Sequence, residues 1–403
     1  MHEFDSACAQ PPARRGRGLL IYSAVALLAA TLGVGTTLAV RHFGIGPDAA
    51  PVPIVTMNDE AVYGKVEPGV VDVSADLQYL DETAEGTGFV INAAEGLVLT
   101  NNHVIDGATS VTITPVLTGK SYPATVVGYD LPDDIAVLQA KGVPGLKAVT
   151  MGDSAGLSIG TAVLALGNEA GQGGPPTIAP GVISDLSRSI VASDESSGLT
   201  ETLHGMLQTS ANIRPGDSGG PLADASGQVV GIDTAAGDGG PGVAYAGYAI
   251  PINTAADIAR QILGGHSGPA IHLGMPAFLG VLLPNSASTS PQRQDGSAHV
   301  GAGAGPSCLA SDPTGYNTGP ARIAPAASGA LVDGVVCGTP ASAAGLTAGD
   351  VITGFDGHTI TSATALSSML DSDRPGVTGS LSWISTGGVR HTAIVTLSTG
   401  PAG

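Results

Sequence analysis

Short runs of apolar and β-branched residues, broken by glycine, aspartate, asparagine and proline, begin at Val66 and continue along most of the chain. Such spacing is typical of an antiparallel β-barrel or β-sandwich. The scarcity of aromatic residues, 3% of the chain, suits β-rich domains built from small side chains. The pattern is clearest at residues 70–73, 88–91, 97–99, 111–113 and 124–127.

The bulk composition excludes several classes of function. With 403 residues the chain can form two or three domains, each with its own core. Its 34 acidic residues outnumber 15 basic ones, and the net charge of −19 argues against binding nucleic acid, whose phosphates need a basic surface. Three cysteines cannot form a usual four-ligand zinc site, and HExxH and CxxC spacings are absent. We therefore predict no metal and no organic cofactor.

The N-terminal region predicts a membrane anchor. Residues 1–18 are polar and contain three arginines, whereas residues 19–40 carry no charge and are numerous enough to span a bilayer as a helix. The alternative is a cleavable signal peptide, but its apolar core would be shorter. The excess of arginine before the span places the N-terminus in the cytoplasm and the rest of the chain outside it. Residues 41–64, rich in proline and alanine, are predicted to be a linker.

Ser218 is the strongest candidate for a catalytic residue. It lies in the run Gly216-Asp217-Ser218-Gly219-Gly220-Pro221-Leu222. A serine becomes a useful nucleophile only when a base takes its proton and the resulting oxyanion is stabilised. Flanking glycines let the backbone turn sharply and direct N–H groups at one point. The alternative interpretation is an ordinary turn between strands, in a chain that contains 60 glycines.

Two further residues supply the other parts of a catalytic triad. His103 follows an apolar, strand-like run, and Asp134 directly precedes another such run at residues 135–138. That position holds the Asp134 carboxylate at the edge of a core, whereas Asp130 and Asp133 resemble turn and surface acids. The chain order histidine, aspartate, serine is the order found in chymotrypsin. A lone histidine would more often be structural, so the prediction of a triad rests on all three residues and their order together.

These motifs together resemble an HtrA/DegP-type serine protease, a trypsin-like domain followed by a PDZ domain. The resemblance implies a trypsin-like double β-barrel at residues 65–265, a linker at 266–274 and a small α+β PDZ domain at 275–400. It also implies that His103 is the general base, that Asp134 orients it, and that the N–H groups of Gly216 and Ser218 form the oxyanion hole. The resemblance rests on residues 86–90, 100–104, 134–138, 166–168, 208–209, 215–222, 231–235 and 248–251.

The predicted PDZ domain contains a candidate peptide-binding loop. In PDZ domains such a loop offers backbone N–H groups to a peptide carboxylate, and the next strand pairs with the peptide. A helix at residues 363–370 would border the groove with Leu366, and another helix at 254–263, capped by Asn253 or Thr254 and closed by Gly264, would end the protease domain. The loop residues are Phe278, Leu279, Gly280 and Val281.

A Ser/Gly/Pro/Ala-rich insertion at about residues 284–328 departs from the compact family pattern. It brings Cys308 into the same extracytoplasmic region as Cys337, where disulfides persist. A bridge between them would contribute roughly 3 kcal/mol on the loop-entropy model. We treat it as a candidate disulfide. Cys8 lies on the reducing side of the membrane and is predicted to be a free thiol.

The resulting functional prediction is a membrane-anchored, extracytoplasmic serine endopeptidase. The resemblance implies that it cleaves unfolded or misfolded proteins, binds C-terminal peptides and assembles as a homotrimer. The alternative is a membrane-tethered peptide-binding or chaperone module whose triad is intact but idle.

The nucleophile turn departs from the family at two positions. HtrA-type proteases usually carry Asn-Pro-Gly-Asn-Ser, and this chain has Arg214-Pro215-Gly216-Asp217-Ser218. A carboxylate beside the oxyanion hole would oppose the negative charge that develops in the transition state. Three arrangements are open at this point. The Arg214 guanidinium pairs with Asp217, a new N-terminal amine formed by processing pairs with it, or both side chains point into solvent.

Overall fold

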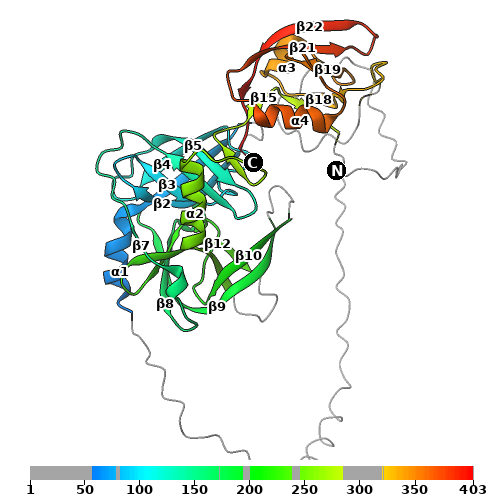
Figure 1. Ribbon diagram of the computed structural model, residues 1–403. Coiled ribbons are helices and arrows are strands. Elements are labelled where there is room, and N and C mark those ends of the chain that lie inside the picture. The colour runs from blue at the N-terminus through cyan, green and yellow to red at the C-terminus, as the bar shows by residue number, and fades with distance from the viewer. Residues whose placement is uncertain are drawn as a thin grey trace, which may run out of the picture. The chain divides into compact units, whose positions relative to one another are not determined.

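The computed structural model describes residues 57–402, except 79–81, 172, 194–199, 238–245, 285–319 and 321. The predicted membrane anchor at residues 19–40 therefore lies outside the described residues. Within them, no helix has the length and apolar character needed to cross a membrane. The described part is mainly β-structure, in agreement with the prediction (Figure 1).

The first sheet closes into a six-stranded antiparallel barrel. Its strands follow the order β5-β4-β1-β2-β3-β6, and an additional β5–β6 pairing closes the ring. Strand β14 (Ile271–Leu273) pairs with β5, although it lies in the predicted linker at 266–274. The barrel strands are β1 (Val70–Leu77), β2 (Glu82–Asn92), β3 (Leu97–Thr100), β4 (Ser110–Pro115), β5 (Tyr122–Asp130) and β6 (Ile135–Gln139).

The second sheet closes in the same way. Its order is β11-β8-β9-β10-β13-β12, and β11 pairs with β12 to complete the ring. Strand β7 (Thr150–Met151) adds to β12 in parallel. The barrel strands are β8 (Ala162–Gly167), β9 (Thr177–Ser193), β10 (Thr200–Thr209), β11 (Pro221–Asp224), β12 (Gln228–Gly237) and β13 (Ala246–Pro251).

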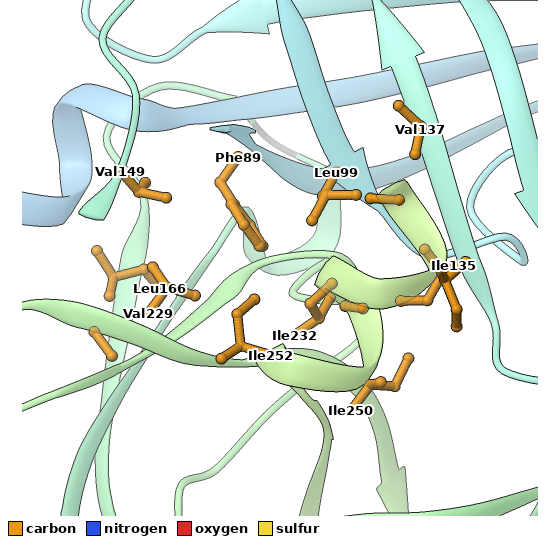
Figure 2. Close-up of a cluster of buried hydrophobic side chains, with 14 of the residues drawn as sticks. Phe89, Leu99, Ile135, Val137, Val149, Leu166, Val229, Ile232, Ile250 and Ile252 are labelled. Carbon is orange, nitrogen blue, oxygen red and sulfur yellow. The ribbon is translucent and has the colours of Figure 1, made fainter. Parts of the chain in front are cut away.

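A shared hydrophobic cluster holds the two barrels together. Alternate residues of a strand point to opposite faces, so one face can fill a barrel while the other packs outside it. Phe89 and Leu99 come from the first barrel, and Leu166 and Ile232 from the second, and all four side chains are completely buried in one cluster (Figure 2). This packing fixes the position of one barrel relative to the other, and both barrels contribute residues to the site.

Two helices pack on the same cluster. Helix α1 (Asp59–Val66) occupies the end of the predicted linker and buries Val62 and Val66, while Asn58 caps its start. Helix α2 (Ile252–Leu263) ends at Gly264 as predicted, but it begins at Ile252 after Pro251 and has no side-chain cap. The Asn253 amide instead donates to Asp153, because Asn253 already lies inside the first turn. Short 3-10 turns lie at Glu67–Gly69 (η1), Ser154–Gly156 (η2) and Glu169–Gly171 (η3).

The C-terminal region, taken by itself, forms a small α+β unit around its own core. A sheet of order β17-β19-β21-β22, with β20 on β19, packs with two helices, and two short strand pairs complete it. The helices are α3 (Pro340–Ala344) and α4 (Ala363–Ser372). The strands are β15 (Ala277–Phe278), β16 (Val281–Leu282), β17 (Ala330–Leu331), β18 (Gly334–Val335), β19 (Val351–Phe355), β20 (His358–Thr359), β21 (Thr378–Ile384), β22 (Arg390–Thr396) and β23 (Ser398–Thr399).

The shared cluster predicts which substitutions destabilise the double barrel. Phe89→Ala should lower the free energy of unfolding by about 3–5 kcal/mol, because it removes a fully buried ring between the barrels and leaves a cavity. Ile159→Ala is the control, since Ile159 is 68% exposed in the same domain and its change should stay within about 0.5 kcal/mol. Urea unfolding of both variants in a Ser218→Ala background, which prevents self-cleavage, measures the difference. Equal effects would contradict the assignment of this core.

Candidate active site

Asp134 and His103 form a tightly held pair at the edge of the first barrel. Asp134 precedes β6 and is 1% exposed. Its Oδ1 accepts from the His103 backbone N–H at 2.9 Å, and its Oδ2 lies 2.8 Å from His103 Nδ1. A carboxylate can only accept, so His103 Nδ1 carries the proton and Nε2 keeps a lone pair. That tautomer is the one a general base requires.

The second barrel also contributes to this pair. Thr234, on β12, donates its hydroxyl to Asp134 Oδ2 at 2.6 Å, and the Asn101 amide donates to the Asp134 carbonyl at 2.9 Å. Asp134 has a φ of 53°, a left-handed conformation that aspartate adopts more readily than most residues. The surrounding hydrogen bonds hold that conformation. The orienting acid is therefore fixed by residues of both barrels.

Ser218 lies in a turn that the backbone holds from both sides. Gly219 N–H donates to the Asp233 carbonyl at 2.7 Å, and Thr87 N–H donates to the Ser218 carbonyl at 2.8 Å. Gly219 has a φ of 85°, and a Cβ there would meet the Thr87 carbonyl oxygen at 2.0 Å. Only glycine fits this position. The sequence is glycine-rich here because the chain passes so close to β2.

The Ser218 hydroxyl donates to the Thr234 carbonyl at 2.9 Å. A hydroxyl has one proton to donate, so it must rotate away from that carbonyl before His103 can receive the proton. The structure thus brings Ser218, His103 and Asp134 to one place between the barrels, in a resting arrangement of the serine.

The backbone around Gly216 fits the predicted oxyanion hole. Gly216 has a φ of 95°, and its carbonyl accepts the Thr87 hydroxyl at 2.7 Å. The same hydroxyl accepts the Asn168 N–H at 2.8 Å. Among the described residues, neither the Gly216 N–H nor the Ser218 N–H donates to another protein group. Both donors are therefore available for an oxyanion.

Sequence reasoning named no role for Thr87, Asn168 or Thr234, although all three lie in the motifs that carried the family resemblance. The hydroxyls of Thr87 and Thr234 and the backbone N–H of Asn168 link the nucleophile turn and Asp134 to the neighbouring strands. Threonine is common in strands, so its presence alone gives no signal. Their position next to Gly86, Gly167 and Asp233 was the only sign available in the sequence.

Two acids are buried beside the nucleophile. Asp217 is 5% exposed, and its Oδ2 accepts the Arg214 backbone N–H at 2.9 Å. Burial raises the pKa of the Asp217 carboxyl to about 6, with the Arg214 N–H opposing the shift. Asp233 is fully buried on β12, and burial followed by repulsion from Asp217 raises its pKa well above the ordinary value. Neither Asp233 carboxyl oxygen has a hydrogen-bond partner among the described residues.

The Arg214 side chain makes an ion pair with Glu169. It is the Arg214 backbone N–H that donates to Asp217. The guanidinium charge still lowers the pKa of Asp217, as the smallest of the four contributions. Burial of Asp217 excludes the arrangement in which both side chains point into solvent. The cause is the close packing of the turn on Gly167, where a Cβ would lie 2.5 Å from Asp217 Oδ1.

The predicted peptide-binding loop lies between β15 and β16. Leu279 is completely buried in the core of the C-terminal unit, and so is Leu366 on α4. Gly280 has a φ of 85°, and Val281 is half-buried at the start of β16, which pairs on one edge with β18. Phe278 pairs with Ser398. A charged residue at position 279 would therefore disrupt the core, and a Leu279→Asp variant would lose stability as well as any peptide binding.

Cys337 is disulfide-bonded. Cys308 lies outside the described residues, so its predicted pairing with Cys337 stays a prediction. In the described ranges, no group of three histidine, cysteine, aspartate or glutamate side chains could hold a metal ion.

The triad geometry on two closed barrels defines a trypsin-like serine endopeptidase, and a trypsin-like peptidase domain matches residues 86–232. A PDZ domain matches residues 311–395. Serine protease PepD of Mycobacterium tuberculosis is 32% identical over 94% of this chain and 78% of its own length. The chain belongs to the HtrA/DegP family of serine proteases.

Other relatives match over a smaller part of their length. The putative serine protease HhoA of Synechocystis is 32% identical over 71% of this chain and 64% of its own length. The periplasmic pH-dependent serine endoprotease DegQ of Escherichia coli is 32% identical over 72% of this chain and 54% of its own. The chain thus spans between about half and about four-fifths of these relatives.

The buried acids predict a specific pH dependence of stability. Because the folded pKa of Asp217 is raised from 3.8 to about 6, its carboxyl favours folding below the unfolded pKa and that contribution is lost as pH rises through 6. Asp217→Asn keeps an acceptor for the Arg214 N–H but does not ionise. It should match the parent near pH 4 and be more stable by roughly 3 kcal/mol at most near pH 8. Urea unfolding across this range tests it, and a constant difference would contradict it.

Proposed function

We propose that this protein is a membrane-anchored, extracytoplasmic endopeptidase that cleaves unfolded or misfolded proteins through Ser218. The observation that carries the proposal is the Asp134 carboxylate, which accepts from His103 and from Thr234 of the second barrel. This contact supports His103 Nε2 as the base, and Thr234, whose carbonyl accepts the Ser218 hydroxyl, connects the pair to the nucleophile turn. The N-terminal anchor rests on the uncharged residues 19–40, and the unfolded-protein substrate and the homotrimer enter this proposal through the family resemblance. Membrane fractionation and chemical crosslinking of the full chain test the anchor and the trimer.

The reaction would proceed through an acyl-enzyme. As Ser218 Oγ attacks the scissile carbonyl carbon, its proton passes to His103 Nε2, and the carbonyl electron pair moves onto oxygen. The Gly216 and Ser218 N–H groups hold that oxyanion. When the C–N bond breaks, His103 returns the proton to the leaving amine. Water then repeats the sequence, with His103 as base, and releases the acid. Asp134 stays ionised and stabilises the imidazolium.

A fluorophosphonate probe tests this assignment directly. The full chain should be labelled at Ser218, and labelling should disappear in Ser218→Ala. Asp134→Asn should lower the turnover of a peptide substrate by about 10⁴, because the histidine then adopts the wrong tautomer. Asp130→Asn is the control, since Asp130 is a buried acid on the same strand-turn-strand segment outside the triad. Absence of labelling under every condition would favour the idle-triad binding module instead.

We also propose that the loop Phe278–Val281 binds the C-terminal carboxylate of extended peptides. Among the described strands β16 pairs only with β18, and its second edge would be the one that pairs with a peptide strand. In the described residues, the Leu279 and Gly280 N–H groups donate to no protein group, which leaves them for a carboxylate.

Peptides themselves provide the sharpest test of this loop. A fluorescent peptide that ends in valine with a free carboxylate should bind Ser218→Ala protein at least tenfold more tightly than the same peptide with a C-terminal amide. The amide removes the charge that the backbone N–H groups would hold. Fluorescence anisotropy measures both affinities. Equal binding of the two peptides would refute carboxylate recognition at this site.

A further inference from the structure

Asp72 is an acid beside the nucleophile turn to which the triad chemistry assigns no role. It lies on β1 directly opposite Thr87 on β2. Directly opposed residues of an antiparallel pair share a face, so the Asp72 and Thr87 side chains are neighbours. Thr87 in turn bonds the Ser218 carbonyl through its N–H and the Gly216 carbonyl through its hydroxyl. A single residue, Thr87, thus connects Asp72 to the turn that holds the nucleophile.

The environment of Asp72 is unfavourable for its charge. The side chain is 8% exposed, and its Oδ1 is buried without a hydrogen-bond partner among the described residues. Burial raises the pKa of the Asp72 carboxyl to about 6, and repulsion from Glu85 adds to the shift. Buried carboxyl oxygens are normally paired, since leaving one unpaired costs free energy. An incoming cation would supply the missing partner.

Glu85 gives this face a second acid. It lies opposite Ser74 on the β1–β2 ladder and accepts the Ser74 hydroxyl at 2.9 Å. Asp72 and Glu85 are therefore diagonal neighbours on one face, within reach of a single long side chain. None of the ion pairs between described residues involves either acid. The two carboxylates repel each other, and no cation of the described residues pairs with them.

Three glycines, Gly171, Gly173 and Gly174, lie in the segment that approaches these acids. A Cβ on Gly171 would lie 2.7 Å from the Glu85 Cβ, so a larger residue would press on that side chain. A Cβ on Gly173 would find only Asp72 Oδ2 within 4 Å, at 3.7 Å, and one on Gly174 would find nothing. The glycines therefore approach the acids without covering them with side chains.

We propose that Asp72 and Glu85 form a subsite that binds a lysine or arginine side chain of the substrate, close to the scissile bond. The proposal rests on the peptidase function proposed above and names a substrate feature that this function does not require. Lysine and arginine bury an aliphatic stem and place the charge at its end, which fits a site made of one buried and one exposed acid. Asp72 and Glu85 act as specificity-determining residues and take no part in proton transfer.

The test is a lysine scan of one peptide substrate. Lysine is placed singly at each of four positions on either side of the cleaved bond, and norleucine, which has a similar apolar stem without charge, is the matched control. One position should show a kcat/KM at least tenfold higher for lysine than for norleucine. That ratio should fall to about twofold or less in Asp72→Asn, and Glu85→Gln should lower it several-fold.

Asp76→Asn is the matched control variant, because Asp76 is an exposed acid on the same strand, opposite Thr83 and away from the nucleophile turn. It removes the same charge and should keep the lysine ratio. A ratio near one at every position, in protein that reacts with the fluorophosphonate probe, overturns the subsite and leaves the peptidase intact. An equal loss in Asp76→Asn also overturns it, because general charge would then explain the preference.

A binding measurement decides the case if the probe does not react. Ser218→Ala protein should bind the best lysine peptide at least tenfold more tightly than its norleucine partner, and Asp72→Asn in that background should remove the difference. Equal binding overturns the subsite independently of catalysis. Glu85→Gln is the second variant to measure if Asp72→Asn does not fold, since Glu85 is exposed and its substitution leaves the core untouched.

Discussion

The hydrogen bond from Thr234 to Asp134 is the contact on which the site depends, because it joins the two barrels at the catalytic acid. Asp134 comes from the first barrel and Thr234 from the second. A carboxylate buried to 1% exposure would be costly alone, and three donors to its two oxygens offset that cost. The same strand that supplies Thr234 also bonds the Ser218 hydroxyl and the Gly219 N–H. Any shift of one barrel against the other would therefore affect acid, base and nucleophile together.

Negative charge around the nucleophile is the second constraint. Asp217 and Asp233 are buried next to Ser218, and the raised pKa of each reduces the charge that the developing oxyanion meets. The Arg214–Glu169 ion pair lies on the same turn but is half exposed, so its contribution is small. On the β1–β2 ladder, Asp72 and Glu85 add two acids that pair with no cation among the described residues. An acidic chain of net charge −19 would attract basic segments of a substrate to this region.

The sequence predicts a triad because the chemistry of a triad demands particular residues in particular contexts. A histidine after one strand, an aspartate before another and a serine between glycines are rare together, and the chain brings them to one place. Predictions from local sequence failed where tertiary packing determined the structure. Helix α1 forms in a segment whose composition indicated a linker, because Val62 and Val66 bury themselves in the shared core. The Leu279 side chain belongs to the core, so only its backbone N–H is left for the predicted role in peptide binding.

The amino-acid sequence by itself determined the β-rich class and the unusual charges of the nucleophile turn, and it predicted the nucleophile, the base and the orienting acid. These depend on residue type and local spacing. Only the tertiary structure decided that Thr87 and Thr234 brace the site, that Arg214 pairs with Glu169, and that Asp72 lies beside Thr87 with its Oδ1 unpaired among the described residues. Those facts follow from strand register and barrel closure, which join residues far apart in the chain and so leave no local trace in the sequence.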